Sequence, residues 1–533
     1  MSPQWIIAPI VLPLLVAALQ LLLGERRRGL AVALSLLSCV ALVVLAALLL
    51  LAAAAQGTDG AMTAVYRIGD WPARFGIVLV LDRLSALMVL LTAVMALAAL
   101  PAALGHWQHR GSYFQPLFQF LLMGLNGAFL TGDLFNLFVF FEVLLAASYG
   151  LALHGSGVRR VSAGLHYIAI NLTASMLFLL GVSLIFGVTG TLNMAVLAEI
   201  IPTLPGHTRA LLHAGAAILG VALLIKTAMW PLGFWLPRTY AAATPAVAAM
   251  FALMTKVGIY VLLRLSLLLF GGVSGASSHF GSQWLLWGGV ATMIAGTVGM
   301  LGARDLGKLA GYNVIISSGT LLGAIGLQHP GVTAGALAYL VMSTLGIAAF
   351  FLVVGMLTPD AEEKLEDALP LEPYESGGGE LRGELFAEED ESRVVITAPI
   401  AMLGICFLAC AVLLAGLPPL AGFLAKFALL APVLEITPRL APLVLFTVII
   451  AAGFCTLIAM CRAGIQIFWA EPERHFPRVG IAEVGATVFL LGLGLLLSIA
   501  TRAPMDYLAA TADQLHAPVS YIHEVLPLSQ AQP

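Results

Sequence analysis

Four ionisable side chains stand within long apolar stretches, where a charge is unfavourable: Glu142, Lys226, Lys256 and Lys426. A charge at the centre of a bilayer costs roughly 2.5–3.5 kcal/mol on insertion scales, so it must find a counter-ion, water or a change of protonation. A carboxylate beside a lysine forms an ion pair, and a buried lysine without a partner can release its proton. A row of such groups at one depth, with water between them, predicts a proton path.

Two of the lysines lie next to prolines. Lys226 precedes Pro231 in the same apolar stretch, and Lys426 follows Pro418 and Pro419. Proline removes a backbone donor and breaks a helix. A charge beside a helix break at membrane depth is a known way to build an ion site.

The composition requires a membrane to hold these elements. The chain has 533 residues, of which 60% are hydrophobic and only 10% charged, whereas soluble domains carry about 25% charged residues. We therefore exclude a soluble protein and predict an all-α polytopic membrane protein. Residues 5–23 are followed by arginines rather than a cleavage signal, so they are expected to be a retained first span.

About 20 apolar residues are needed to cross a bilayer, and fourteen stretches qualify. They are residues 5–23, 29–55, 78–104, 114–131, 133–153, 162–187, 209–239, 245–270, 283–303, 308–328, 331–357, 394–431, 441–468 and 480–500. The spans 209–239 and 394–431 are too long for one plain helix, and both contain prolines near the middle. Each is predicted to be broken there.

The basic residues of the loops predict the orientation. Most of them collect on one side, which is then cytoplasmic, and fourteen spans place both termini on the outer side. The cytoplasmic loop 358–393 is rich in acidic residues. It is most simply a solvated linker, with cation gathering or subunit docking as alternatives. The five cysteines form no CxxC motif and are expected to be small core residues rather than metal ligands or disulfides.

A faint internal repeat suggests a division of the chain. The sequence PLGF at residues 231–234 resembles PLAGF at residues 419–423. Spans 4–8 and 9–13 are each five helices with the broken one fourth, so the two halves run in opposite directions through the membrane, as in many transporters. The predicted units are spans 1–3 (residues 1–113), a first inverted repeat (114–270), a second inverted repeat (271–468) and the last span with its tail (469–533).

Depth separates the candidate proton carriers from other charges. At about 1.5 Å per residue, Glu142, Lys226 and Lys256 fall near the midplane, and Lys426 lies just beyond the second break. Arg264 and Arg462 are expected to be static salt-bridging or snorkelling residues. Most histidines are expected at the interface. His329, before a span junction, is a candidate proton exit.

Several motifs resemble one known family. They are GDLFNLFVFFEVL at residues 132–144, KTAMWPLGFWLP at 226–237, ATPAV at 243–247, TKVGIY at 255–260 and GLPPLAGFLAKF at 416–427. They resemble the antiporter-like subunits shared by respiratory complex I and the multisubunit Mrp-type sodium/proton antiporters. The first motif, with GDWP at 69–72 and LDRLS at 81–85, is similar to the D-type subunits of the Mrp systems, which are also called Mnh or Pha systems.

The resemblance implies a fold with 14 helices and two inverted five-helix bundles. It implies that Glu142 and Lys226 form a coupled pair, that Lys256 carries protons onward and that Lys426 is the exit-side lysine. One span departs from the family pattern. Where many relatives have a histidine or lysine, this chain offers only Tyr339, Ser343 and Thr344. Water held by those hydroxyls would have to complete the path.

Three functions compete at this point. The first is a proton-translocating subunit of a Na+ or K+/proton antiporter in a bacterial plasma membrane, a transporter subunit rather than an enzyme. The second is a pump subunit of a redox complex, and the third is an inert scaffold. Other antiporter subunits, protons and monovalent cations are the expected partners, with no cofactor, metal or nucleic acid. Asp133 and Asn136 are the weaker candidates for cation contact.

Overall fold

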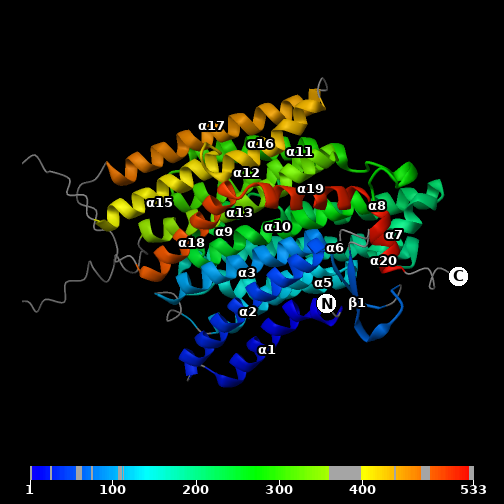
Figure 1. Cartoon of the computed structure of the whole chain (residues 1–533), viewed down its shortest axis with the longest axis horizontal. Helices are drawn as coiled ribbons and strands as arrows, with labels where there is room; N and C mark the ends of the chain where they lie inside the picture. Colours follow the sequence, from blue (N-terminus) through cyan, green and yellow to red (C-terminus); the bar gives the residue numbers. More distant parts are fainter. Residues whose placement is uncertain are drawn as a thin grey trace, which may run out of the picture.

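The computed structural model describes residues 3–24, 27–55, 63–73, 76–105, 111, 113–358, 398–436, 440–469 and 480–526. Long helices run side by side in one bundle (Figure 1). A helix satisfies its own backbone hydrogen bonds, which a chain must do where it crosses hydrocarbon. The predicted acidic linker lies, apart from Thr358, outside the described residues.

The helices that make the bundle follow the predicted spans closely. They are α1 (Ala8–Leu23), α2 (Arg28–Ala55), α3 (Arg83–Leu104), α4 (Phe114–Leu130), α5 (Leu134–Ala152), α6 (Val158–Thr189), α8 (Gly206–Lys226), α9 (Leu236–Ala242), α10 (Pro245–Leu268), α11 (Ser282–Gly302), α12 (Leu306–Leu327), α13 (Pro330–Leu357), α15 (Ala398–Ala415), α16 (Ala421–Glu435), α17 (Leu440–Phe468) and α18 (Ile481–Ile499).

Within the described residues, 13 helices are long and apolar enough to cross a membrane. The remaining predicted span, 114–131, is α4, which has 17 residues and is almost wholly buried among its neighbours. The prediction of an all-α polytopic protein with about 14 spans is therefore confirmed. The proposed inverted relation between the two halves, and the domain limits drawn from it, stay predictions.

Both predicted breaks are present. The seventh span is α8 followed by α9, and Ala228 between them has φ +56°, in the left-handed region that helices exclude. The twelfth span is α15 followed by α16, and Gly416 at that break has φ +77°. The first break is fastened to α11, because the backbone N–H of Trp230 donates to the Thr292 hydroxyl over 3.0 Å.

The prediction was wrong where it began the third span at residue 78. Residues Val78–Leu81 form strand β2, which pairs antiparallel with β1 (Ala64–Arg67). The helix starts only at Arg83 because Asp82 and Ser85 make a reciprocal capping box at its first turn. An apolar run alone does not distinguish a short buried strand from the start of a helix.

Short elements that the span count did not anticipate lie beyond the main helices. They are α7 (Met194–Ile200), α19 (Arg502–His516), α20 (Val519–Val525) and the 3-10 turns Pro3–Ile7, Ile68–Asp70, Ile201–Thr203 and Gly275–Ser277. Helix α19 packs on α13, α10 and α3, while α20 packs on α7 and β1. The chain after the last span thus packs back against the bundle and contacts its central helices.

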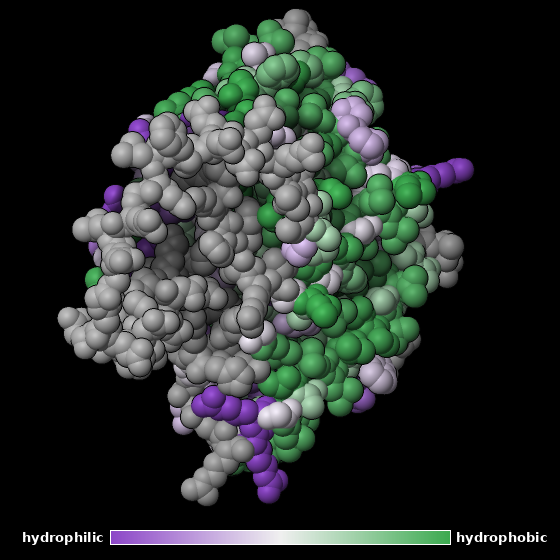
Figure 2. All heavy atoms as spheres, turned by 90° about the vertical axis from the view of Figure 1, so that its left-hand side faces the viewer, coloured by the Kyte–Doolittle hydropathy of each residue, from purple (hydrophilic) through white to green (hydrophobic). Residues whose placement is uncertain are grey.

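The centre of the bundle is α10. Its residues from Ala246 to Leu268 are all buried, and it packs against α3, α12 and α13. A helix that is apolar all round is expected in such a place. By contrast, the outer helices expose many large hydrophobic side chains, as a surface facing lipid must. In the view onto one end of the bundle, hydrophobic residues also predominate on the coloured part of the face (Figure 2). All five cysteines are free, and three of them are buried.

The first and last described segments, the turn Pro3–Ile7 and α20, lie toward the same end of the bundle, together with β1 and α7 (Figure 1). We call this the terminal end. An even number of crossings requires this arrangement.

A buried ion pair fixes α10 near the terminal end. Arg264 on α10 donates to both carboxylate oxygens of Asp82, over 2.7 and 2.9 Å, and both side chains are about 95% buried or more. Its guanidinium also donates to the Tyr260 hydroxyl and stacks on the Tyr521 ring of α20. The salt bridge expected for Arg264 is therefore present. Arg462 is structural too, since it donates to two carbonyl groups at the end of α11.

We predict that Arg264→Met lowers the stability of the folded protein by about 3–5 kcal/mol, because it leaves the Asp82 carboxylate buried without a partner. The double variant Arg264→Met with Asp82→Leu removes both charges and should recover most of that loss. Thermal unfolding of the purified protein measures both. A double variant as unstable as the single one would contradict this account.

Candidate functional site

Glu142 and Lys226 face each other from α5 and the end of α8. The Lys226 ammonium lies 4.9 Å from the centre of the Phe141 ring and is acted on electrostatically by Glu142. The two charged groups are not in contact, because the Glu142 carboxylate instead accepts a short hydrogen bond from the Ser175 hydroxyl of α6. Among the described residues, the Lys226 ammonium has no hydrogen-bond partner, although its side chain is buried.

Lys256 occupies the middle of α10 and is fully buried. Its ammonium donates to the Ser317 hydroxyl of α12 over 2.7 Å. The Ser317 hydroxyl donates in turn to the Ser343 hydroxyl of α13 over 2.9 Å. Two serines therefore extend a chain of hydrogen bonds from Lys256 to α13, the span where the family pattern has a titratable residue. The chain ends at the Leu340 carbonyl, to which the Ser343 hydroxyl donates over 3.3 Å.

Lys426 reaches back from α16 across the second break. Its ammonium donates to the carbonyl oxygens of Leu414 and Ala415, over 3.2 and 2.7 Å, at the end of α15. Those carbonyls lack helical partners and carry the negative end of the helix dipole, so they favour a cation. A side chain at Gly416 or Gly453 would collide with Lys426, since an added Cβ would lie within about 3 Å of it.

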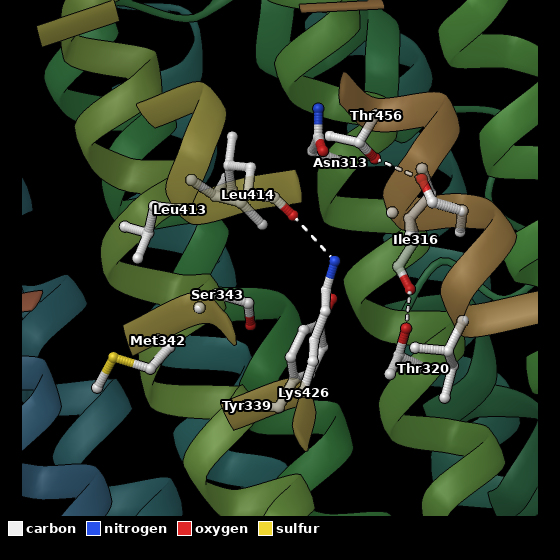
Figure 3. Close-up of a pocket in the computed structure, with 15 residues that line it drawn as sticks. Asn313, Ile316, Thr320, Tyr339, Met342, Ser343, Leu413, Leu414, Lys426 and Thr456 are labelled. Atoms are coloured by element: carbon white, nitrogen blue, oxygen red, sulfur yellow. Dashed lines mark hydrogen bonds between the residues drawn. The ribbon is translucent and has the colours of Figure 1, made fainter. Parts of the chain in front are cut away.

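A small cavity joins the serine chain to Lys426 (Figure 3). It is lined by Ser343, Tyr339, Thr320, Asn313, Thr456 and Lys426, among others. Its volume is about 20 Å³, and roughly 10–15 Å³ is enough for one water molecule. The cavity therefore has room for one water molecule between the residues that line it, which include Ser343 and Lys426.

The three hydroxyl residues predicted on α13 take different positions. Ser343 and Tyr339 line the cavity, and Tyr339 faces the Thr320 and Ser317 side chains. Thr344 does not line it, and its hydroxyl donates to the Leu340 carbonyl of its own helix. No hydrogen bond among the described residues connects Lys226 to Lys256.

Asp133 and Asn136 lie at the start of α5. One Asp133 carboxylate oxygen caps the helix by accepting from the backbone N–H groups of Phe135 and Asn136, and the Asn136 amide donates to Thr131. These groups are occupied by local structure. Over the described part of the chain, no group of three or more His, Cys, Asp or Glu side chains could hold a metal ion.

His329 begins α13 at the terminal end. Its carbonyl accepts from Thr333, and the Thr333 hydroxyl meets the Nε2 atom of His516 at 3.0 Å. Within the described chain, the His329 Nδ1 atom has no hydrogen-bond partner. Burial, with a smaller contribution from His329, lowers the pKa of His516 to about 4. His516 therefore holds α19 on α13 in its neutral form.

The neutral hydroxyl residues beside these charged groups were not predicted from the sequence. Ser317 and Thr320 on α12 and Ser175 on α6 stand within apolar spans, and a search for neutral hydroxyl groups at midspan would have found them. Their role could not be assigned without knowing which helices are neighbours.

The fold and its buried charges define a polytopic helical membrane protein with ionisable groups along its interior. A family model described as "NADH:quinone oxidoreductase/Mrp antiporter, TM" matches residues 131–452, and the chain belongs to this family. The match contains all four charged site residues.

Relatives give the branch of the family. The chain is 51% identical over 536 residues to the D subunit of a probable K(+)/H(+) antiporter of Rhizobium meliloti (strain 1021), covering 99% of this chain and 98% of that protein. It is 34% identical to the D subunit of the Na(+)/H(+) antiporter of Alkalihalophilus pseudofirmus, over 98% and 99% of the two chains. A chain in the structure of the Mrp complex from Dietzia sp. DQ12-45-1b has a TM-score of 0.76 at 27% identity, over 99% and 100%.

The attachment of α19 should weaken in acid. Because the pKa of His516 is lower in the folded protein than the usual value of about 6.5, the detached state binds the proton more readily. The stabilisation is complete above about pH 6.5 and is lost as pH falls toward 4. Amide hydrogen exchange in residues 502–516, corrected for intrinsic rates, should be faster at pH 5 than at pH 7.5. The variant His516→Leu should show no such pH dependence; an equal dependence in both proteins would contradict the assignment.

Proposed function

We propose that the chain is the proton-translocating subunit of a multisubunit monovalent cation/proton antiporter. The relatives named as D subunits of K+/H+ and Na+/H+ antiporters support this function. The observation that carries the proton-path assignment is the hydrogen-bonded chain from Lys256 through Ser317 and Ser343 to the cavity at Lys426. A static scaffold has no need of such a chain between buried lysines.

The proposed first step is an electrostatic switch between Glu142 and Lys226. When the two groups pair, Glu142 holds the proton on the lysine. When Glu142 turns to Ser175, as in the observed arrangement, the buried Lys226 ammonium has no acceptor and its proton is free to leave. Coupled groups of this kind titrate as a pair rather than singly.

The proposed second step takes the proton from Lys256 to Lys426. The two serine hydroxyls pass it on by donating and accepting in turn, and one water in the cavity completes the transfer. Tyr339 would help to hold that water. The step from Lys226 to Lys256 requires water or side-chain movement between α8 and α10, which pack together.

The proposal also assigns the chain a membrane, an orientation and an internal symmetry. The chain would lie in a bacterial plasma membrane with both termini on the outer side, as its basic loop residues predict. Residues 114–270 and 271–468 would be inverted repeats, each with one broken helix. His329 would lie near the proton exit at the terminal end.

We expect Glu142→Ala and Lys226→Ala each to reduce cation-dependent proton transport to the level of vesicles without the complex, because each removes one half of the switch. The measurement is proton flux on addition of Na+ or K+ to inverted vesicles that contain the whole antiporter. Arg462→Ala is a suitable control, since Arg462 is a charged residue that only caps α11.

Assembly of the variants must be verified by co-purification with the other subunits. Full antiport by both variants would refute the switch. Purification with iron–sulfur proteins instead of small membrane subunits would favour the redox-complex alternative.

The serine chain has its own test, with a matched control on the same helix. Ser343→Ala removes the last hydroxyl before the cavity and should slow proton transport by about tenfold or more, which corresponds to roughly 1.4 kcal/mol in the barrier. Thr344→Ala removes a neighbouring hydroxyl that bonds only within its helix and should have little effect. Equal rates for the two variants would show that protons do not pass Ser343.

A further inference from the structure

A large apolar cavity lies on the side of the broken helix α8. Its volume is about 600 Å³, and its walls come from α8, α10 and the start of α11, with α6 and the Met194–Thr203 segment closing one side. Along α8 the lining runs from Leu212 to Leu224, a distance of about 18 Å at 1.5 Å per residue. The cavity therefore reaches from the terminal end of the bundle to the first helix break.

The two ends of the cavity differ in polarity. Its deep end is formed by apolar side chains, including Leu223, Met229 and Leu232 of the break. His279 and Gln283 stand only at the terminal end, beside Trp284, which is 81% exposed. Tryptophan is enriched where a bilayer meets water, so this end lies at the membrane interface. The cavity therefore matches an amphiphile, which has a long apolar part and one polar end.

We propose that a phospholipid of the leaflet at the terminal end occupies this cavity, with one acyl chain inside and its polar head beside His279 and Gln283. The cavity lies between α8, α10 and α11, which are all long and apolar enough to cross a membrane, so the bilayer is the nearest source of an occupant. A spanning helix of a partner would need an apolar groove of about 30 Å, whereas the cavity extends about 18 Å along α8 and is polar at one end only.

The acyl chain would pack directly against the break of the first half. Met229 and Leu232 belong to the segment between α8 and α9, and Lys226 lies one turn from Leu223. The lipid would thus fill the space behind the broken backbone and keep water out of it. Water that entered the cavity would come from the membrane surface rather than along the proposed proton path. It would then reach the backbone groups that the break leaves without helical partners.

Gly220 offers a test that does not disturb packing. It lines the cavity, and a Cβ added there meets no atom within 4 Å. Gly220→Phe therefore starts a larger side chain from open space in the wall of the cavity. Gly187 of α6 also has no atom within 4 Å of an added Cβ but does not line the cavity, so Gly187→Phe is the matched control.

The whole antiporter complex is placed in nanodiscs of phosphatidylethanolamine and phosphatidylglycerol that contain phosphatidylethanolamine with a photoreactive acyl chain. After illumination, labelled peptides are identified by mass spectrometry. We expect labels at Leu223, Met229 and Leu265 in the wild type and the Gly187→Phe variant. In Gly220→Phe the labelling of these residues should fall by about tenfold.

Unchanged labelling in Gly220→Phe, or labels confined to exposed helix faces in the wild type, would overturn the proposal. Cross-linking of a Leu265→Cys variant to another subunit would also overturn it, because a protein partner would then fill the space. If Gly220→Phe fails to assemble, Ala216→Trp tests the same loss of labelling from a position one turn earlier on α8.

Discussion

The arrangement of this protein depends on how a lysine ammonium is accommodated away from water. The second half solves the problem with broken backbone, since Lys426 donates to the free carbonyls of Leu414 and Ala415 at the end of α15. The prolines that interrupt the span make those carbonyls available. Gly416 and Gly453 leave room for the side chain. The helix break and the buried charge therefore depend on each other, because the break supplies free carbonyl acceptors and the lysine supplies the donor that they lack.

In the first half, the buried lysine ammonium has no such carbonyl acceptors within the described part of the chain. Lys226 also ends a helix at a break, but its ammonium rests over the Phe141 ring without an acceptor among the described residues, while Glu142 is bonded to Ser175. A cation over an aromatic face is only partly stabilised. The two halves thus differ in what lies against the buried ammonium: free helix carbonyls in the second half and an aromatic ring in the first.

Much of this could be predicted from the sequence. Apolar length gave the spans and proline gave both breaks, because these depend on local chemistry. The strand at Val78–Leu81 and the docking of α19 could not be predicted, since pairing with β1 and packing on α13 are not local properties. For the same reason the chain through Ser317 was missed. The role of a serine within an apolar span cannot be inferred until the neighbouring helix is known to present a lysine.

The polar path and the apolar cavity require each other. A proton path works only if water enters along it and nowhere else, and a broken helix is the place where unwanted water is most attracted. Lys226, from which a proton is proposed to pass to Lys256, lies at the first break. The cavity of about 600 Å³, polar only at its terminal end, reaches the same break at Met229 and Leu232. If that cavity filled with water, the break would connect the proton path to the membrane surface by a second route. An acyl chain in the cavity closes that route while leaving the backbone of the break free to move.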